Sequence, residues 1–302
     1  MNYKRLETFV WVATLGSFRK VAERLFTTQP AISNRIAALE SELGCRLFER
    51  DQGQGGVTLT SKGKELLPYA EKIIFMSEKL IQRADADQAH SGLLRLGVSE
   101  TIVHSWLPQF MSRLSEEMPN IDIELTVDVT SNLRSALLEH AIDLAFLMGP
   151  LVEPQVENID LCSFPIHWVA SPKLSLPKRR LELHELTTWP IITYAKNTKP
   201  FAQIDRRFRS TDRVPARFFS SSSLAASVRM TVDGVGISAL PDAVIERYLE
   251  RGELVRLNVE WEPGELFFTA SYTTTRPSYI VENACRSALD IAQKYERDHV
   301  ER

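Results

Sequence analysis

The chain has 302 residues, of which 44% are hydrophobic and 25% charged, and its formal net charge is −3 at pH 7. This length and composition are typical of an ordinary globular protein with more than one domain. No uncharged apolar run of ~18 residues occurs and the first residues lack the apolar core of a signal peptide, so we expect no membrane span. Three widely separated cysteines predict no disulfide framework, which favours a cytoplasmic location.

Charge is unevenly distributed along the chain. Residues 1–64 contain ten Lys/Arg and six Asp/Glu, net +4, which leaves −7 for the remainder. A basic head on an acidic body is compatible with nucleic-acid binding by the head. The histidines and cysteines have no metal-ligand spacing, and no phosphate loop or nucleophile elbow is present. We therefore expect no metal, no cofactor and no enzymatic activity.

The first 43 residues have the pattern of three helices. Tyr3–Leu15 repeats apolar side chains at helical spacing, and Gly16 and Ser17 suit the end of one helix and the cap of the next. Apolar residues at positions 18, 21, 22 and 25 predict a second, short helix. Phe26 and Thr27 form the turn before the third. Two short helices joined by a tight turn, with a supporting helix before them, predict a helix-turn-helix.

The third helix, Thr27–Leu43, has two unlike faces. Apolar side chains at 32, 36, 39 and 43 form one stripe, and short side chains at 33, 34, 37 and 41 lie opposite. Thr28 can cap the first turn, where Pro30 needs no amide partner. A helix seated by one stripe can present its slim polar face to a DNA major groove. The alternative is an ordinary solvated surface helix.

We expect the first turns of this third helix to contact DNA. Gln29 suits an adenine edge and Pro30 suits a thymine methyl group. Ser33 and Asn34 are expected to reach bases or phosphates. Arg35 lies nearer the apolar stripe and is expected to reach the phosphate backbone. The alternative for Gln29 is a secondary role in capping the helix.

A glycine-rich hairpin is predicted after the third helix. Leu47 and Phe48 supply apolar anchors, Val57–Leu59 has the pattern of a short strand, and glycines at 53, 55 and 56 make the turn. This pattern predicts the wing of a winged helix, with Arg50 as its phosphate contact. A surface ion pair between Arg50 and a neighbouring carboxylate is the alternative.

A long amphipathic helix is predicted from Thr60 to about His90. Positions 66, 70, 73, 77, 80 and 84 form a repeat of about 3.5 residues, while the far face is charged. Pro68 removes one helical hydrogen bond and predicts a kink or restart. This stripe is too long for a small head to cover, so we expect a dimer through this helix. The alternative is packing on the chain's own second domain.

From residue 92 the pattern changes to alternating strands and helices, which predicts a parallel α/β sheet. A second run of this kind begins near Cys162. We therefore expect two lobes, with the chain crossing between them near 163 and again near 268. The elements of the first run are predicted at 94–98, 101–118, 121–129, 131–140 and 142–147, and those of the second at 166–170, 190–193, 200–208, 216–219, 224–232, 241–251, 266–272 and 278–297.

Several predicted strands are followed by hydroxyl or glycine residues, at the edge where α/β lobes bind ligands. Hydroxyls and free backbone amides at helix starts suit an anion, and Lys196 can add a positive charge. We therefore predict a cleft for a small molecule, an organic acid by these criteria. Each residue taken singly could be an ordinary helix cap. The predicted contacts are Ser99, Thr101, Ser131, Gly149, Tyr194, Lys196, Asn197 and Ser221.

Two segments of the head carry a specific motif, LETFVWVATLGSFRKVAERLFTTQPAISNRIAALESELGCRLFER and VTLTSKGKELLPYAEKI. Its residues at fixed spacing include the pairs Gly16-Ser17, Gln29-Pro30, Leu43-Gly44 and Leu59-Thr60. With this motif the chain resembles the LysR-type transcriptional regulators. The remainder matches the layout of that family's effector domain less specifically, through VGISALP at 235–241 and the two-lobe pattern.

The resemblance implies a winged helix-turn-helix domain at 1–60, a linker and dimerisation helix at 61–90, and an effector-binding domain at 91–302. The last is expected to be a two-lobed α/β domain similar to periplasmic binding proteins. Lobe I would comprise 91–162 and 268–302, and lobe II 163–267.

The resemblance also implies a homodimer, usually assembled into a homotetramer, that binds double-stranded promoter DNA and responds to a small-molecule effector. Contact with RNA polymerase is compatible with it. The wing segment DQGQGG is longer than is usual in the family and lacks a basic residue. A different class remains open, a two-lobed small-molecule binding module whose head serves oligomerisation only. By position, the DNA-facing residues would be Thr28, Gln29, Pro30, Ser33, Asn34 and Arg35, with Arg50 at the wing.

Overall fold

The computed structural model describes residues 2–50, 56–84, 92–209, 215–274 and 278–300. The chain forms two compact units, residues 1–90 with 274–282 and residues 91–273 with 283–302. Among the described helices, none combines the length and the apolar character that crossing a bilayer requires.

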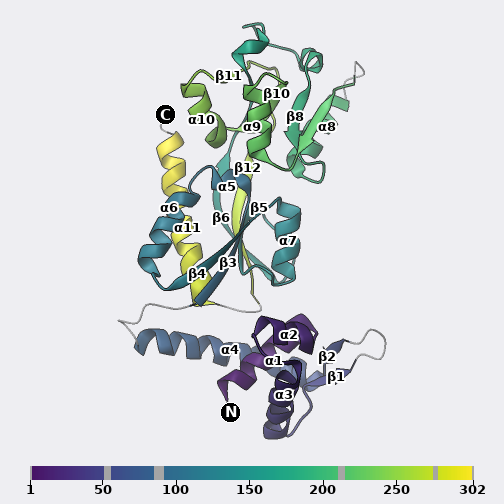
Figure 1. Cartoon of the computed structure of the whole chain (residues 1–302), viewed down its shortest axis with the longest axis vertical. Helices are drawn as coiled ribbons and strands as arrows, with labels where there is room; N and C mark the ends of the chain where they lie inside the picture. The colour runs from purple at the N-terminus through teal and green to yellow at the C-terminus, as the bar shows by residue number, and fades with distance from the viewer. Residues whose placement is uncertain (1, 51–55, 85–91, 210–214, 275–277, 301–302) are drawn as a thin grey trace. The chain divides into compact units, whose positions relative to one another are not determined.

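The first unit is a winged helix-turn-helix followed by a long helix, as predicted (Figure 1). Its two strands form an antiparallel hairpin in which Phe48 lies opposite Leu59. The tip of the predicted wing, 51–55, and the predicted end of the long helix, 85–90, lie outside the described residues. The elements are α1 Tyr3–Leu15, α2 Phe18–Arg24, α3 Gln29–Leu43, β1 Phe48–Arg50, β2 Val57–Leu59 and α4 Ser61–Ala84.

The ends of these helices follow from short polar residues and glycines. The side chain of Ser17 accepts a hydrogen bond from the amide of Lys20 at the start of α2. Thr28 does the same for Ala31 at the start of α3, so its predicted capping role is confirmed. Gly44 ends α3 with φ of 68°, a left-handed conformation that glycine adopts without steric cost.

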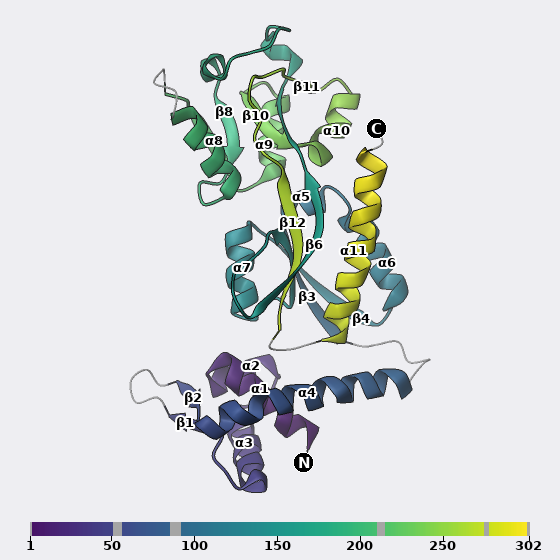
Figure 2. The same ribbon diagram turned by 180° about the vertical axis from the view of Figure 1, so that it is seen from behind.

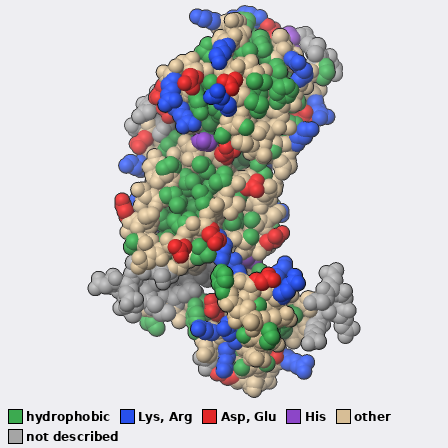
Figure 3. Space-filling model, viewed as in Figure 1, with side chains coloured by type: hydrophobic (Ala, Val, Ile, Leu, Met, Phe, Trp, Pro, Cys, Tyr) green, Lys and Arg blue, Asp and Glu red, His purple; other side chains and the backbone are tan. Residues whose placement is uncertain are grey.

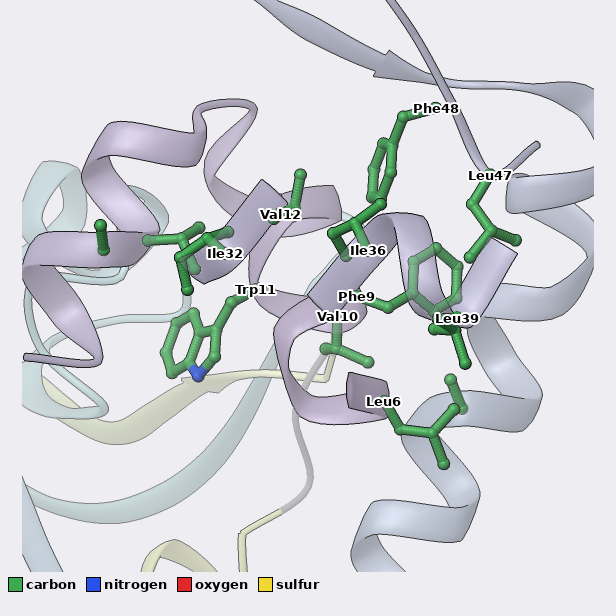
Figure 4. Packing of buried hydrophobic residues seen from close by; sticks show 13 residues of the cluster. Leu6, Phe9, Val10, Trp11, Val12, Ile32, Ile36, Leu39, Leu47 and Phe48 are labelled. Carbon is green, nitrogen blue, oxygen red and sulfur yellow. The ribbon is translucent and has the colours of Figure 1, made fainter. Parts of the chain in front are cut away.

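The core of the head is built from α1, the apolar stripe of α3 and the hairpin (Figure 4). Ile32, Ile36 and Leu39 are at most 3% exposed, which fixes one face of α3. Phe9 of α1 meets the ring of Phe48 edge-on at a centroid distance of 5.5 Å. The prediction for Leu43 was wrong, because this last helical residue lies one turn beyond the core and is 38% exposed.

Helix α4 divides its apolar residues between two rows. Leu66, Ala70 and Ile74 pack on the core of the head. A second row is exposed. The single apolar repeat predicted from the sequence is therefore divided between two rows, because its first two members, Leu66 and Ala70, pack on the core of the head. The helix is continuous through Pro68, without the predicted restart. The exposed row consists of Tyr69, Ile73, Met76 and Leu80, which are 65%, 42%, 57% and 70% exposed.

Lobe I of the second unit is a five-stranded sheet in the order β4-β3-β5-β12-β6. Strands β3, β4 and β5 are parallel, whereas β12 runs antiparallel to both of its neighbours, so the sheet is mixed rather than parallel. Helices α6 and α11 lie side by side on one face, joined by Arg113 and Asp290 at 3.2 Å, and α7 covers the other (Figures 1 and 2). Its elements are β3 Gly92–Val98, α5 Glu100–Val103, α6 Leu107–Glu117, β4 Ile121–Val127, α7 Thr130–Leu138, β5 Leu144–Met148, β6 Val156–Phe164, β12 Leu266–Thr273 and α11 Tyr279–Val300.

Lobe II has its own five-stranded sheet, in the order β11-β7-β10-β8-β9. Strands β8, β9 and β10 are parallel, and β7 runs antiparallel to β10. The chain enters this lobe at Pro165, between β6 and β7, and leaves it between β11 and β12. Its elements are β7 Ile166–Ala170, two 3₁₀ turns at Pro172–Leu174 and Leu183–Thr188, β8 Ile191–Tyr194, α8 Lys199–Arg209, β9 Phe218–Ser221, α9 Leu224–Val232, β10 Ile237–Pro241, α10 Asp242–Glu250 and β11 Val255–Arg256.

Three sequence predictions for this unit differ from the structure. The single helix predicted over 101–118 is two helices, because the chain turns at residues 104–106 to bury Trp106 completely. Strand β6 begins at Val156 and was missed. Strand β4 ends at Val127 rather than at 129, and it is at the edge of its sheet, where Leu125 and Val127 are 44% and 47% exposed.

Candidate functional site

The predicted DNA-facing residues lie together at the start of α3. Five of them are exposed and Arg35 is half-buried. The stripe on the opposite side of the helix is buried, so this polar end is held in a fixed orientation. It presents two hydroxyls, two carboxamides and one apolar ring within two turns. The exposed residues are Thr28, Gln29, Pro30, Ser33 and Asn34.

Phe26, which the sequence suggested only as a turn residue, is 92% exposed. Its φ is 48°, in the left-handed region that a bulky residue rarely adopts. Neither the exposure nor the conformation favours folding, and the residue lies two positions before the cap of α3. Phe26 therefore joins the candidate DNA-facing surface. The sequence signal was an aromatic residue in a turn that ordinarily contains small or polar residues.

Arg50 is the last residue of β1, and its backbone pairs with Val57 of β2. The longer wing segment noted in the sequence spans 51–56, of which 51–55 lie outside the described residues. The phosphate contacts predicted for Arg50 and for the wing therefore stay predictions.

In the effector domain, the ends of strands from both lobes surround a cavity of about 390 Å³. Lobe I contributes residues that follow β3 and β4 and the end of β5, and lobe II contributes the ends of β8 and β9 and the start of α9. The lining residues are Ser99, Glu100, Thr101, Val127, Asp128, Val129, Thr130, Met148, Thr193, Tyr194, Ala195, Thr198, Ser221, Ser222, Ser223, Leu224, Ser227, Ala239, Leu240, Leu266 and Phe268.

Half of the predicted ligand contacts do not line this cavity. Asn197 instead donates a hydrogen bond of 2.9 Å to the hydroxyl of Ser131, which ties lobe II to lobe I. Gly149 is a packing residue, since a Cβ there would lie 2.1 Å from Oγ1 of Thr269. Lys196 is exposed and borders a separate hollow against α8. The predicted residues that do line the cavity are Ser99, Thr101, Tyr194 and Ser221.

Glu100 is a cavity residue that the sequence prediction missed. Its carboxylate extends from lobe I to the start of α9, where it accepts hydrogen bonds from the amides of Leu224 and, at 2.9 Å, Ala225. Nε2 of His104 lies 3.8 Å from the same carboxylate. Burial alone would raise the pKa of Glu100, but His104 and the two amides outweigh it and hold the pKa below its ordinary value of 4.5. Glu100 is therefore an anion that joins the two lobes.

Asp128 is the second acidic residue of the lining. Its Oδ1 accepts hydrogen bonds from the amide of Val129 at 2.7 Å and from the side-chain amide of Asn132 at 2.9 Å. Both donors lie at the start of α7. Asp128 itself is exposed at the cavity's edge.

Three hydroxyls of the lining are buried without a hydrogen-bond partner among the described residues. They are Oγ of Ser99, Oγ1 of Thr193 and the phenol of Tyr194. Burial raises the pKa of Tyr194, so its phenol stays protonated and can donate. Buried polar groups are normally paired, so three orphans on one cavity indicate a missing polar partner.

The described residues contain no cluster of His, Cys, Asp and Glu able to hold a metal ion. Cys162 is buried, and burial raises the pKa of its thiol to about 12 although the indole of Trp106 donates to the sulfur at 3.4 Å. A thiol of this kind is poorly reactive.

Comparison with known proteins accounts for both halves of the chain. Residues 3–64 match the family of bacterial regulatory helix-turn-helix proteins of the lysR type, and residues 87–287 match the LysR substrate-binding domain. The HTH-type transcriptional regulator CzcR of Bacillus thuringiensis is 29% identical over 297 residues, covering 98% of both chains. GltR of Bacillus subtilis is 28% identical over 257 residues, covering 84% of both.

Solved structures share the fold over the whole chain. A full-length OxyR variant from Pseudomonas aeruginosa aligns with a TM-score of 0.63 at 20% identity, covering 97% of this chain and 95% of that one. LysG of Corynebacterium glutamicum, solved with its effector arginine bound, aligns with a TM-score of 0.66 at 18% identity, covering 97% and 99%. With a DNA-binding head and an effector domain that both match family models, this chain belongs to the LysR family of transcriptional regulators.

Proposed function

We propose that this regulator reads promoter DNA through α3 and is controlled by a small molecule in the cavity of its effector domain. The exposed polar start of α3 carries the proposal, because its opposite face is fixed in the core of the head. Gln29 and Pro30 read base edges, and Ser33 and Asn34 contact bases or phosphates. Arg35, and Arg50 in the wing, bind the phosphate backbone.

The working form is a homodimer joined through α4, with two dimers forming a tetramer. The support is the exposed row Tyr69, Ile73, Met76 and Leu80, whose spacing of four, three and four residues averages about 3.7, close to the 3.6 residues of a helical turn. An exposed apolar row with this period is typical of a helix that packs on another helix. Two copies of the head then bind a site with two-fold symmetry.

Residues 1–60 bind DNA, 61–90 form the linker and dimer helix, and 91–302 bind the effector. Within the last, lobe I comprises 91–164 and 266–302, and lobe II 165–265, a small shift from the predicted bounds that keeps β6 and β12 whole in lobe I. Binding of the effector alters how the dimer holds promoter DNA and, through it, RNA polymerase. The protein has no catalytic role in this proposal and acts in the cytoplasm, where the promoter is.

The test is a mobility-shift assay on DNA from upstream of the gene, with random DNA as competitor. The double variant Gln29→Ala and Ser33→Ala removes two proposed base contacts, so the affinity for the promoter should fall by at least about tenfold. The matched control is Ser41→Ala, an exposed serine farther along α3. Its affinity should equal that of the unaltered protein.

The alternative, a small-molecule binding module whose head serves oligomerisation only, makes the opposite prediction. Its promoter affinity would be no greater than its affinity for random DNA and would not change in the double variant. That result would overturn the DNA-reading proposal even if the effector domain bound a ligand.

A further inference from the structure

The charge of the effector cavity is one-sided. Of the residues that line it, only Glu100 and Asp128 are charged, and both are acidic. Lys and Arg side chains are spread among acidic ones over the face of lobe II shown in Figure 3, yet no Lys, Arg or His belongs to the lining. The sequence prediction of an organic acid relied on Lys196, which borders a different hollow. Within the described part of the chain, the lining therefore offers no cation to neutralise an acidic ligand.

The start of α9, which faces the cavity, already has an anionic partner. The amides of Leu224 and Ala225 donate to Glu100, and Ser223 lies 3.5 Å from the same carboxylate. Just before α7, Oδ1 of Asp128 accepts hydrogen bonds from the amide of Val129 and the side-chain amide of Asn132. Backbone amides at a helix start attract one anion, and at α9 the chain supplies it. A carboxylate ligand would have to displace Glu100 at α9 or lie beside the negative charge of Asp128 at α7.

The carboxylates of Glu100 and Asp128 differ in whether an oxygen remains available to a ligand. The oxygens of Glu100 face Leu224, Ala225, Ser223 and His104. Asp128 uses only Oδ1, and its Oδ2 accepts no hydrogen bond within the described part of the chain. Asp128 is thus the free anionic acceptor at the edge of the cavity.

The unpaired hydroxyls in the interior of the cavity are independent evidence for a bound ligand. Ser99 and Thr193 are 7% and 2% exposed, and their hydroxyls, like that of Tyr194, have no partner within the described residues. Apolar side chains of Met148, Leu240, Leu266 and Phe268 complete the lining. The occupant must therefore combine a polar group for the hydroxyls with an apolar body.

We propose that the effector is an amine: a small molecule with an apolar body and a protonated amino group held by Asp128. This inference rests on the proposed effector function of the cavity and replaces the organic acid by a cation. The ammonium group donates to the free Oδ2 of Asp128, and the negative charge of Glu100 adds to its attraction. The inner hydroxyls bind the ligand's other polar groups.

The experiment uses three probes of nearly equal size that differ in one group: benzylammonium, benzyl alcohol and benzoate. Binding of each to the full-length protein is measured by ligand-detected NMR at millimolar concentration and near-neutral pH. Benzylammonium should bind, with an affinity about tenfold above that of benzyl alcohol, and benzoate should not bind.

Two variants assign the effect to one side chain. Asp128→Asn should reduce the affinity for benzylammonium about tenfold and leave that for benzyl alcohol unchanged. The matched control is Asp122→Asn, because Asp122 is exposed on β4, the strand that Asp128 follows, but does not line the cavity. The control makes the same change in net charge and should bind all three probes as the unaltered protein does.

Tighter binding of benzoate than of benzylammonium would overturn the proposal, as would equal binding of benzylammonium and benzyl alcohol. An unchanged affinity in Asp128→Asn, or no binding of any probe, would also contradict it. The mobility-shift assay on the same samples separates the two proposals. Loss of promoter specificity with amine binding intact rejects DNA reading alone, whereas promoter binding with the wrong probe preference rejects the amine alone.

Discussion

The head and the effector domain build their functional surfaces in different ways. In the head, six of the candidate DNA-facing residues fall within eight consecutive positions, from Thr28 to Arg35, at the start of a single helix. In the effector domain, the cavity collects residues from Ser99 to Phe268, contributed by both lobes. The first surface depends on where one helix begins. The second depends on how two sheets are joined.

This difference decides what holds each site in shape. The face of α3 is fixed by a buried stripe that includes Ile32 and Ile36, so its orientation is a property of the core of the head. The cavity is held by a few polar contacts between lobes, above all Glu100 with α9 and Asn197 with Ser131. We expect substitutions in the head to act on DNA affinity, and substitutions between the lobes to act first on the stability of the effector domain.

The largest effect is expected from the exposed row of α4. Replacing Ile73 and Leu80 by lysine puts like charges on both helices of the proposed dimer without touching the core of the head. The protein should become monomeric in sedimentation velocity, and promoter affinity should fall by roughly a hundredfold, since each head then binds alone.

The control for that change is Val152→Lys, which alters an even more exposed apolar residue, 88% exposed, in the effector domain. Its oligomeric state and DNA affinity should be unchanged. A doubly substituted protein that stays dimeric would show that α4 is not the dimer helix.

The head could be predicted closely from the sequence because its signals are local. Gly16, Ser17 and Thr28 mark helix ends that the structure confirms, and each acts within four residues of its own position. The error at Leu43 is of another kind. Helical spacing shows which side chains share a face, but not how far along that face the core extends.

The second largest effect concerns Glu100, whose carboxylate accepts backbone amides of the opposite lobe. Glu100→Gln keeps the shape but loses the charge, so the free energy of unfolding of the effector domain should fall by about 1 to 2 kcal/mol at pH 7. Urea titration followed by far-UV circular dichroism measures it. The control is Glu139→Gln, an exposed carboxylate that does not line the cavity.

The pH dependence of that difference has a definite sign. The pKa of Glu100 is lowered by folding, so its contribution is complete above the ordinary value of 4.5 and is lost as the pH falls through the lowered value. The stability gap between the unaltered protein and Glu100→Gln should therefore be constant from pH 7 to 4.5 and shrink below it. A gap that widened below pH 4.5 would contradict this assignment.

The cavity was predicted less completely because strand ends identify segments rather than side chains. Ser99, Thr101, Tyr194 and Ser221 were found, since each directly ends or follows a strand. Glu100 was missed, although it lies between two of them, because its partner Leu224 is 124 residues away. Periodicity carries no information about that contact, nor about the path of the loop that turns Lys196 away from the cavity.

A smaller effect is expected at Phe26, where one substitution should stabilise the head but weaken promoter binding. Asparagine tolerates the left-handed conformation better than phenylalanine and removes an exposed ring. Phe26→Asn should raise the free energy of unfolding of the head by about 0.5 to 1 kcal/mol and weaken promoter binding. Thermal unfolding and the mobility shift test the two parts. Stronger binding by the variant would remove Phe26 from the DNA-facing surface.

The smallest effect is expected from Asn197. The sequence suggested it as a ligand contact, whereas in the structure it forms a hydrogen bond between the two lobes. Asn197→Ala removes a single exposed hydrogen bond, so the unfolding free energy should fall by about 0.5 to 1 kcal/mol. Ser131→Ala should lower the unfolding free energy by the same amount. The double variant should lower it no further, because both substitutions remove the same hydrogen bond. In all three variants, the affinity for benzylammonium, measured by NMR, should stay within about twofold of that of the unaltered protein. A twofold change corresponds to about 0.4 kcal/mol, and a residue outside the cavity lining should cause no larger loss. A tenfold loss of affinity would return Asn197 to the ligand site, and it would mean that the two lobes close around the ligand more tightly than in the structure described.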